Sequence, residues 1–361
     1  MIRSPRLSHR STCAWLEPAS ILASKLASPR LWRSFHRMSH AHLPEPYAAL
    51  ALRFGREKLD QRLLTQASHW AKLTHQGSGL FRLENKLPLD AIVAFALTAT
   101  GLSRRARANH LAPRRVECSW EIPRLPAVFA GYRVLQLTDL HLDLDTEFTD
   151  ALIGLLQGVE CDAIVITGDF RNSTRTDFMP SVNEARRLFA TLPAVPRFGI
   201  LGNHDFVEQL PHLEAAGLPM LLNEAAFVER DGQRLWFAGI DDPHFYKTHD
   251  LTAATAAVPA GACTVLLAHS PEIADELGDA RFDLVLCGHT HGGQLCLPGG
   301  RWLHVPVENQ PRERIRGAWK VAGTQGYTSV GTGSCGVPAR LNCHGEFTLH
   351  TLRPTGAVQP S

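Results

Sequence analysis

Five short polar clusters between residues 139 and 291 carry carboxylate, amide and imidazole groups, the side chains that bind divalent cations or transfer protons. They are Asp139-Leu-His141, Asp169, Asn203-His204-Asp205, His269 and His289-Thr-His291. Each cluster directly follows a short apolar run that has the pattern of a strand. Because the carboxyl ends of strands in a layered α/β fold converge on one edge, we expect these side chains to form a single polar site.

Two of these residues, Asp139 and Asp169, would repel each other as neighbouring carboxylates. One or two divalent cations would remove that repulsion. Oxygen and imidazole donors without thiolate suit Mn, Fe or Zn better than a closed structural zinc site. A carboxylate can bridge two cations about 3.5–4 Å apart, and such a pair activates water and stabilises phosphoryl oxygens. The clusters therefore predict hydrolysis of a phosphoester or pyrophosphate bond with metal-activated water.

The elements that position these residues are short apolar strands alternating with helices from Pro126 onwards, a rhythm typical of a layered α/β fold. Helices are predicted at Glu147–Val159 and Ser181–Leu192, and Asp231-Gly232 indicates a hairpin. The predicted strands are Tyr132–Thr138, Ala163–Thr167, Phe198–Leu201, Leu235–Ile240, Thr264–Ala268 and Leu284–Cys287.

Taken in order, the clusters resemble the motif set of the calcineurin-like metallophosphoesterase superfamily. The resemblance is closer to a membrane-associated subgroup that includes the UDP-2,3-diacylglucosamine pyrophosphatases of lipid A synthesis. The segments that carry it are Gly202–Asp205, Gly239–Asp242, His269–Pro271, Gly288–Gln294 and Gly331–Arg340. The resemblance implies a four-layer αββα sandwich, here with an N-terminal helical extension.

The resemblance also implies a role for each residue and two divalent cations, with Mn favoured and Fe or Zn as alternatives. His204 would protonate the leaving oxygen or stabilise its charge, and Asp205 would orient His204 by a hydrogen bond. One cation would be held by Asp139, His141, Asp169 and His291, and the other by Asp169, Asn203, His269 and His289, so that Asp169 bridges the pair.

The substrate is expected to be a phosphorylated small molecule or a nucleotide-lipid. Protein phosphatases of the superfamily carry Gly-Asp-x-x-Asp-Arg-Gly, and Gly168-Asp-Phe-Arg-Asn172 departs from it, which disfavours a phosphoprotein. Two alternatives stay open, a soluble broad-specificity phosphodiesterase and a non-catalytic binding scaffold, although the intact residue set disfavours the scaffold. Four residues are candidates for contact with substrate phosphate or nucleotide, with structural charge as an equal alternative. They are Arg171, Arg340, His244 and Lys247.

The chain changes character near residue 125 and divides into three predicted parts. Residues 1–40 are rich in Arg and Ser, which predicts a disordered leader or a mis-assigned start. Residues 41–125 are predicted to form a helical extension, for which membrane association is one of two interpretations, and residues 126–361 the calcineurin-like metallophosphoesterase domain.

Two helical patterns occupy the extension, at residues 44–85 and at Leu87–Leu102, and the regular spacing is clearest in Tyr47–Leu64. An arginine cluster follows at Arg104, Arg105, Arg107, Arg114 and Arg115. An apolar helix followed by arginines suits a peripheral membrane anchor. A helix packed on the catalytic domain with a solvated basic tail is equally compatible with the pattern, so a membrane surface is one of two candidate neighbours.

The overall composition bounds the remaining possibilities. The 361 residues include 44% hydrophobic ones and carry a formal charge of +2, so nucleic acid is not expected as a partner. The eight cysteines form no Cys-x-x-Cys pair and are expected to be buried reduced thiols, which favours a reducing compartment. We expect a cytoplasmic protein, with peripheral attachment to the inner face of the membrane if the extension is an anchor. The sequence indicates no oligomeric state.

Overall fold

The computed structural model describes residues 43–74, 89–174, 176–278, 282–307 and 310–356. The predicted leader, residues 1–40, lies outside the described residues, as do residues 75–85 of the first helical pattern.

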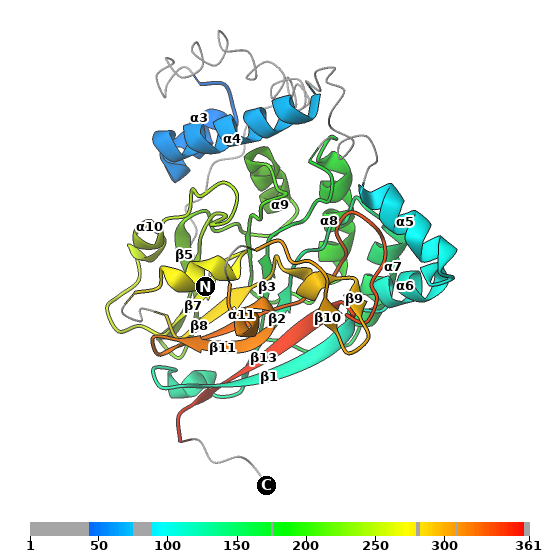
Figure 1. The fold of residues 1–361 in the computed structure, drawn as a ribbon. Coiled ribbons are helices and arrows are strands. Elements are labelled where there is room, and N and C mark those ends of the chain that lie inside the picture. The colour runs from blue at the N-terminus through cyan, green and yellow to red at the C-terminus, as the bar shows by residue number, and fades with distance from the viewer. Residues whose placement is uncertain (1–42, 75–88, 175, 279–281, 308–309, 357–361) are drawn as a thin grey trace.

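Two mixed β-sheets form the centre of the molecule (Figure 1). The first sheet has the order β1 (Arg114–Ile122), β13 (Glu346–Pro354), β2 (Tyr132–Leu137), β3 (Ala163–Thr167) and β4 (Arg197–Ile200). The second has the order β11 (Gly317–Val321), β12 (Thr324–Thr328), β8 (Leu284–Cys287), β7 (Thr264–Leu267), β6 (Gln233–Gly239) and β5 (Glu224–Arg230). The runs β2-β3-β4 and β6-β7-β8 are parallel, so their carboxyl ends point the same way within each sheet.

Helices cover the outer faces of both sheets. Helices α7 (Thr146–Leu156), α8 (Met179–Thr191) and the short α9 (Leu210–Ala215) lie on the first sheet. The second sheet is covered by α10 (Leu251–Thr255) and the 3₁₀ turn η5 (Pro271–Asp275), next to α11 (Arg312–Ile315). Further 3₁₀ turns are η3 (Ala127–Phe129), η4 (Val207–Gln209) and η6 (His291–Gly293), and β9 (Cys296–Leu297) pairs with β10 (Arg301–Trp302).

Three hydrophobic clusters hold these layers together. One lies between the sheets and includes Val165 and Phe237 from opposite sides. A second lies between the first sheet and its helices, and a third lies on the outer face of the second sheet. The predicted four-layer α/β architecture with N-terminal helices is therefore confirmed, as are the six predicted strands and the hairpin at Asp231-Gly232.

The N-terminal region is helical in both of the segments where helices were predicted. The apolar pattern of Tyr47–Leu64 forms two helices, α3 (Tyr47–Phe54) and α4 (Arg56–Thr74), because Gly55 adopts a positive φ of 87° that ends the first helix. Both helices lie beside α9 (Figure 1). The second apolar pattern forms α5 (Leu89–Ala99), followed by α6 (Ser103–His110).

The arginine cluster is also split between two kinds of element. Arg104, Arg105 and Arg107 lie in α6, whereas Arg114 and Arg115 begin β1 and pair in register with the first residues of β13. The change in sequence character near residue 125 therefore falls after β1, which already belongs to the first sheet. Among the described helices, none is both long and apolar enough to cross a bilayer.

A buried chain of polar side chains links the two sheets through His350. The Trp120 indole donates to His350 Nδ1 at 3.0 Å, and His350 Nε2 donates to Gln136 Oε1 at 2.9 Å. Gln136 Nε2 then donates to the Cys287 carbonyl of the second sheet at 2.9 Å. His350 is fully buried, and this burial lowers its pKa to about 3.

This lowered pKa makes His350 a source of acid sensitivity. His350 takes up a proton near pH 6.5 in the unfolded chain but only near pH 3 in the folded protein. The stability that depends on neutral His350 is therefore complete above about pH 6.5 and is lost progressively as the pH falls below it. As the pH falls below about 6, we expect the unfolding free energy of the wild type to decrease relative to that of His350→Gln by about 1.4 kcal/mol per pH unit. Urea unfolding at several pH values checks this, with the exposed His304→Gln as the control; parallel curves would contradict it.

Candidate metal centre

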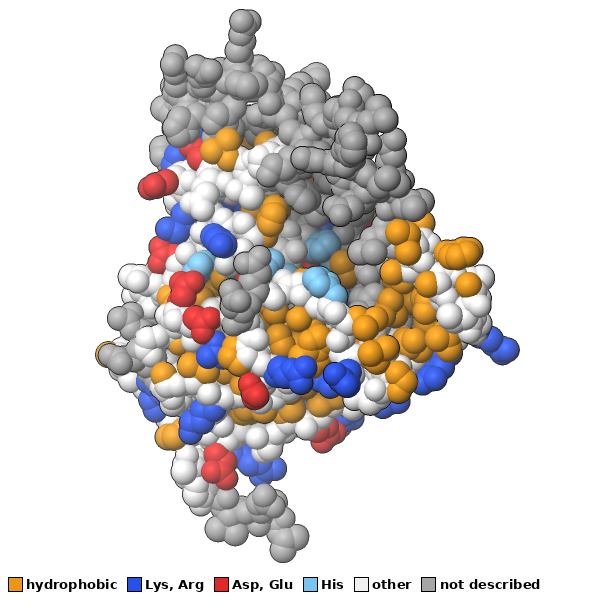
Figure 2. All heavy atoms as spheres, viewed as in Figure 1, with side chains coloured by type: hydrophobic (Ala, Val, Ile, Leu, Met, Phe, Trp, Pro, Cys, Tyr) orange, Lys and Arg blue, Asp and Glu red, His pale blue; other side chains and the backbone are white. Residues whose placement is uncertain are grey.

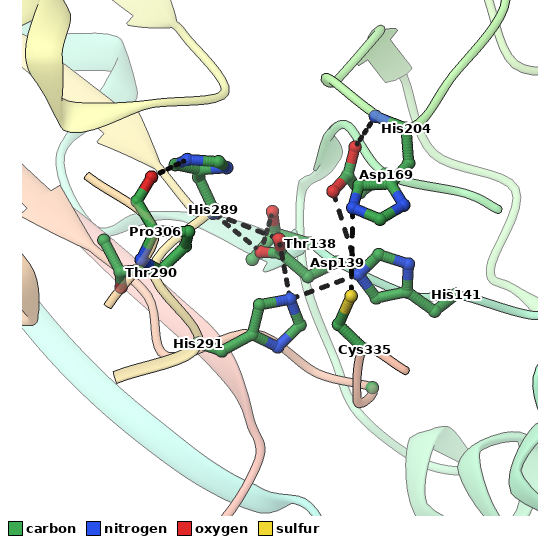
Figure 3. A network of polar contacts seen from close by, with 12 residues as sticks. Thr138, Asp139, His141, Asp169, His204, His289, Thr290, His291, Pro306 and Cys335 are labelled. Carbon is green, nitrogen blue, oxygen red and sulfur yellow. Dashed lines mark hydrogen bonds and ion pairs between the residues drawn. The ribbon is translucent and has the colours of Figure 1, made fainter. Parts of the chain in front are cut away.

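The predicted site residues come together at one edge of the two sheets. Asp139, Asp169 and Asn203 follow β2, β3 and β4 of the first sheet, whereas His269 and His289 follow β7 and β8 of the second. Figure 3 shows how several of these side chains point toward one another from opposite sheets. The cluster thus lies where the two parallel runs end side by side.

One group of donor atoms consists of Asp139, His141 and His291. His141 Nε2 lies 3.1 Å from His291 Nε2, and His291 Nε2 lies 3.4 Å from Asp139 Oδ1. Two ligands about 2.1 Å from a common ion stand about 3.0–3.4 Å apart in octahedral or tetrahedral geometry. The spacing of this group therefore fits a cation, and its three side chains are buried.

A second group surrounds Asp169. Its Oδ2 lies 3.3 Å from His269 Nε2 and 3.7 Å from His141 Nε2, so Asp169 stands between the two sets of histidines. His269 Nε2 also lies 2.9 Å from Asn203 Oδ1. The His289 ring stands 5.1 Å from the His269 ring, centroid to centroid. Asp169 Oδ2 thus lies within 3.7 Å of imidazole nitrogens that follow strands of both sheets.

Three of the four histidines predicted to bind metal are oriented by a hydrogen bond to a backbone carbonyl. His141 Nδ1 donates to Arg171 O at 2.8 Å, His269 Nδ1 to Thr167 O at 2.8 Å, and His289 Nε2 to Pro306 O at 3.0 Å. In His141 and His269 the other nitrogen, Nε2, lies beside Asp169, and such hydrogen bonds are how proteins orient imidazole ligands. His291, by contrast, has the Arg340 guanidinium 3.2 Å from its Nδ1 in place of a backbone carbonyl.

The backbone is strained at five of the seven predicted metal ligands. Asp139, His141, Asp169, His289 and His291 have positive φ values of 51°, 45°, 57°, 72° and 50°. Non-glycine residues rarely adopt this region, and each costs on the order of 1–3 kcal/mol. At each of these positions the chain turns sharply at or just beyond the end of a buried strand.

The glycines beside the ligands act mainly through close approach. A Cβ on Gly202 would lie 2.2 Å from Asp169 Oδ1, and one on Gly288 would lie 2.4 Å from Asp139 Oδ2. Neither glycine has a positive φ, so glycine is not required at these positions for a left-handed turn. The missing side chains instead leave room for the two carboxylates.

Burial and the two carboxylates set the charge of the cluster. Burial raises the pKa of Asp139 to about 6. Burial alone would lower the pKa of His269, but the neighbouring Asp169 raises it to about 10. Burial lowers the pKa of His141 to about 3, so this ring is neutral. Positive charge in the site thus stabilises the buried carboxylates, and divalent cations would supply that charge.

The structure corrects the expected partner of His204. Its Nδ1 donates to Asn172 O at 2.7 Å, and its ring does not take its orientation from Asp205. The Asp205 carboxylate instead accepts the backbone N–H groups of Asp169 at 2.8 Å and Gly202 at 2.9 Å. It also accepts that of Phe170 at 3.0 Å. Asp205 therefore holds together the loops that carry Asp169 and His204, because its side chain turns toward the backbone after β3.

Cys335 lies at the edge of the site and was not predicted. Its Sγ is 3.8 Å from His204 Nε2, and Cys335, His204 and His141 form a third group with donor atoms within 4.8 Å of one another. The donor set expected to lack thiolate therefore has a thiol beside it. Cys335 belongs to the Gly331–Arg340 segment, but nothing in that segment's spacing marks it as a neighbour of His204.

The four candidate phosphate contacts fall into two pairs. Arg171 and Arg340 are fully buried and donate to backbone carbonyls, those of Ser173 and Gly333 among them, and Arg340 also contacts the His291 ring. His244 and Lys247 lie on one turn. The His244 ring is 4.4 Å from the His289 ring, and Lys247 is exposed.

Comparisons with known proteins agree with this arrangement. Residues 132–293 match the calcineurin-like phosphoesterase family. The chain is 30% identical over 229 residues to the uncharacterized metallophosphoesterase YkoQ of Bacillus subtilis, covering 61% of this chain and 83% of that protein. It is 28% identical over 233 residues to the phosphodiesterase YaeI of Escherichia coli, covering 62% and 83%. It is 25% identical over 252 residues to the UDP-2,3-diacylglucosamine pyrophosphatase LpxG of Chlamydia muridarum, covering 55% and 76%.

The close approach of Gly202 to Asp169 gives a direct test of the cluster as a metal site. In Gly202→Ala the new methyl group displaces the Asp169 carboxylate, so we expect Mn(II) affinity to fall about 10–100-fold. Gly154→Ala in α7 is the control, because nothing lies within 4 Å of its Cβ. Isothermal titration of the metal-stripped proteins measures the change, and equal affinities in both variants would contradict the assignment.

Proposed function

Because this chain belongs to the calcineurin-like phosphoesterase family, and is therefore a metallophosphoesterase, we propose that it hydrolyses a pyrophosphate or phosphodiester bond in a nucleotide-lipid. The observation that carries the proposal is the buried cluster of Asp139, Asp169 and four histidines with His204 beside it. The similarity to LpxG supports a substrate of the UDP-2,3-diacylglucosamine type.

The residues present fit two divalent cations, with Mn favoured and Fe or Zn as alternatives. Asp169 would bridge the two ions. When bound, the pair supplies activated water and stabilisation of the phosphoryl oxygens. One ion would be held by Asp139, His141, Asp169 and His291, and the other by Asp169, Asn203, His269 and His289.

His204 is the group proposed to act on the leaving oxygen. Its Nδ1–H is bound to Asn172 O, so Nε2 is the atom that can pass a proton to the departing group. The backbone N–H of His204 donates to Asp169 Oδ1 at 2.9 Å, which ties the ring's position to the proposed bridging carboxylate. Asp205 supports both by holding the surrounding backbone.

Substitution of His204 tests this role. We expect His204→Ala to lower kcat about 10²–10⁴-fold with Mn(II) content unchanged, because the variant loses a proton donor and no proposed ligand. His212→Ala in α9 is the control. Hydrolysis by the Mn(II)-loaded enzyme and metal analysis provide the two measurements. Wild-type-like turnover in His204→Ala would contradict the proposed mechanism.

The second candidate is a broad-specificity phosphodiesterase acting on soluble substrates, which the similarity to YaeI favours. A comparison of kcat/KM for UDP-diacylglucosamine, simple phosphodiesters and phosphomonoesters distinguishes the two. A strong preference for the nucleotide-lipid supports the first candidate, and equal values for soluble diesters support the second. If the reconstituted enzyme cleaves none of them, both fail.

A surface around α5 supports a lipid-linked substrate. Ile92 and Phe95 of this helix are 46% and 74% exposed, although both are large apolar side chains. On its other side α5 packs, through Val93 and Leu97, against a buried cluster that includes Val337 and Ala339. Figure 2 shows hydrophobic side chains gathered on this side of the molecule. The exposed Arg104 and Arg105 follow in α6, so apolar and basic groups lie together as an anionic lipid surface requires.

Vesicle binding tests this surface without disturbing the fold. We expect Arg104→Gln with Arg105→Gln to weaken binding to phosphatidylglycerol vesicles about 30-fold, since each basic residue contributes about 1 kcal/mol. Phe95→Ser should weaken binding further, whereas Leu52→Ser, at an equally exposed apolar site on α3, should not. Co-sedimentation measures each variant. Unchanged binding in the arginine and Phe95 variants would remove the membrane argument and leave the soluble candidate.

A further inference from the structure

We infer that Arg62 of α4 is a positioning residue for the reaction, because it holds the loop of His204 and the loop of His244 in fixed relation to each other. Arg62 lies outside residues 132–293, the part of the chain that matches the family. Its side chain is nevertheless fully buried, at 0% exposure. A buried guanidinium needs several partners, and the residues that Arg62 contacts are more than 140 positions away in the sequence.

The guanidinium makes one contact to each loop. Nη1 forms a hydrogen-bonded ion pair with the Asp241 carboxylate, which is also fully buried. Nη2 donates to the backbone carbonyl of Asp205 at 2.9 Å. The planar group lies over the Tyr246 ring, 3.8 Å from its centroid. The Arg62 guanidinium is thus held by hydrogen bonds at both Nη atoms and by the Tyr246 ring on one face.

The first loop carries the proposed proton donor. Asp205 directly follows His204, and its carboxylate already binds the backbone N–H groups of Asp169 and Gly202. Arg62 fixes the carbonyl end of the same residue. Asp205 is therefore held at both ends, and the His204 backbone between β4 and η4 has little freedom to move away from Asp169.

The second loop carries a basic side chain beside the residues of the candidate metal centre. Asp241 also accepts the Thr248 hydroxyl, and the adjacent Asp242 accepts the backbone N–H of His244 at 3.2 Å. The His244 ring then lies 4.4 Å from the His289 ring, centroid to centroid, at an interplanar angle of 45°. Arg62 therefore anchors the base of the turn that presents His244 to the site.

Two neighbours on α4 reinforce the same connection. Gln66, one turn after Arg62, accepts the Val207 backbone N–H at 3.1 Å, next to the His204 loop. Gln61 donates to the carbonyls of Tyr246 and Lys247, each at 3.3 Å, in the His244 loop. Helix α4 therefore braces both loops, and Arg62 is the one of these residues that contacts both.

Arg53 provides a matched comparison within the same helical region. It binds Glu214 and Glu224 in a similar network, with its Nη1 2.7 Å from Glu214 Oε1 and its Nη2 2.6 Å from Glu224 Oε2. Neither glutamate belongs to the two loops. A purely structural role for Arg62 predicts that the loss of either arginine has the same kind of effect, whereas a positioning role predicts different effects.

The experiment compares Arg62→Gln, Arg62→Lys, Asp241→Asn and Arg53→Gln in the full chain loaded with Mn(II), with bis(p-nitrophenyl) phosphate as the probe. We expect Arg62→Gln to lower kcat about 10–100-fold with little change in KM or bound Mn(II), because misplaced groups affect the transition state more than binding. Arg62→Lys should recover part of kcat. Arg53→Gln should lower the melting temperature and leave kcat within about twofold of the wild type.

Hydrogen exchange separates this inference from the proposed function on which it rests. If the wild type fails to hydrolyse the probe, the proposed function is in doubt, and peptides covering residues 202–209 and 239–248 still report on Arg62. Faster exchange in both peptides of Arg62→Gln, but not of Arg53→Gln, supports the inference. Unchanged exchange, wild-type kcat or loss of Mn(II) in Arg62→Gln overturns it. If Arg62→Gln does not fold, Asp241→Asn, which keeps the side chain's shape, decides by the same measurements.

Discussion

The burial of Asp139 and Asp169 close together is the constraint on which the rest of the site depends. Two carboxylates in a low-dielectric interior repel each other unless positive charge and hydrogen-bond donors surround them. The protein supplies the donors from the backbone, with the N–H of His289 on Asp139 and that of His204 on Asp169. Bound cations would supply the positive charge that these donors do not, and the backbone carbonyls that orient the surrounding histidines prepare the site to hold such cations.

This constraint also explains why the strands end as they do. Left-handed backbone at five proposed ligands is unfavourable, and it persists only where the surrounding structure is rigid. Strands β3 and β8 are buried along their whole length, so the residues that follow them start from fixed positions. The hydrophobic layers therefore stabilise the strained turns, which in turn place the carboxylates side by side.

The ligand types and their strands were predictable because each motif lies within a few residues of a strand, and the bounds of β3 and β8 agree with the prediction. Contacts between distant segments were not predictable. Asp205 was expected to bind the adjacent His204 ring, but the path of the chain after β3 brings backbone N–H groups to it instead. Cys335 and Arg62 reach the His204 loop across 131 and 143 positions, a relation that no local periodicity encodes.

The described elements of the N-terminal region fall into two physically different parts. Helix α4 and strand β1 are bound into the catalytic architecture, through buried contacts to the His204 loop and through pairing with β13. Helix α5 instead leaves large apolar side chains exposed. Removal of the whole region would therefore disturb the site and the surface together. Substitution of the exposed Ile92 or Phe95 is the change that isolates membrane contact from catalysis, because neither belongs to the buried cluster through which α5 packs on the domain.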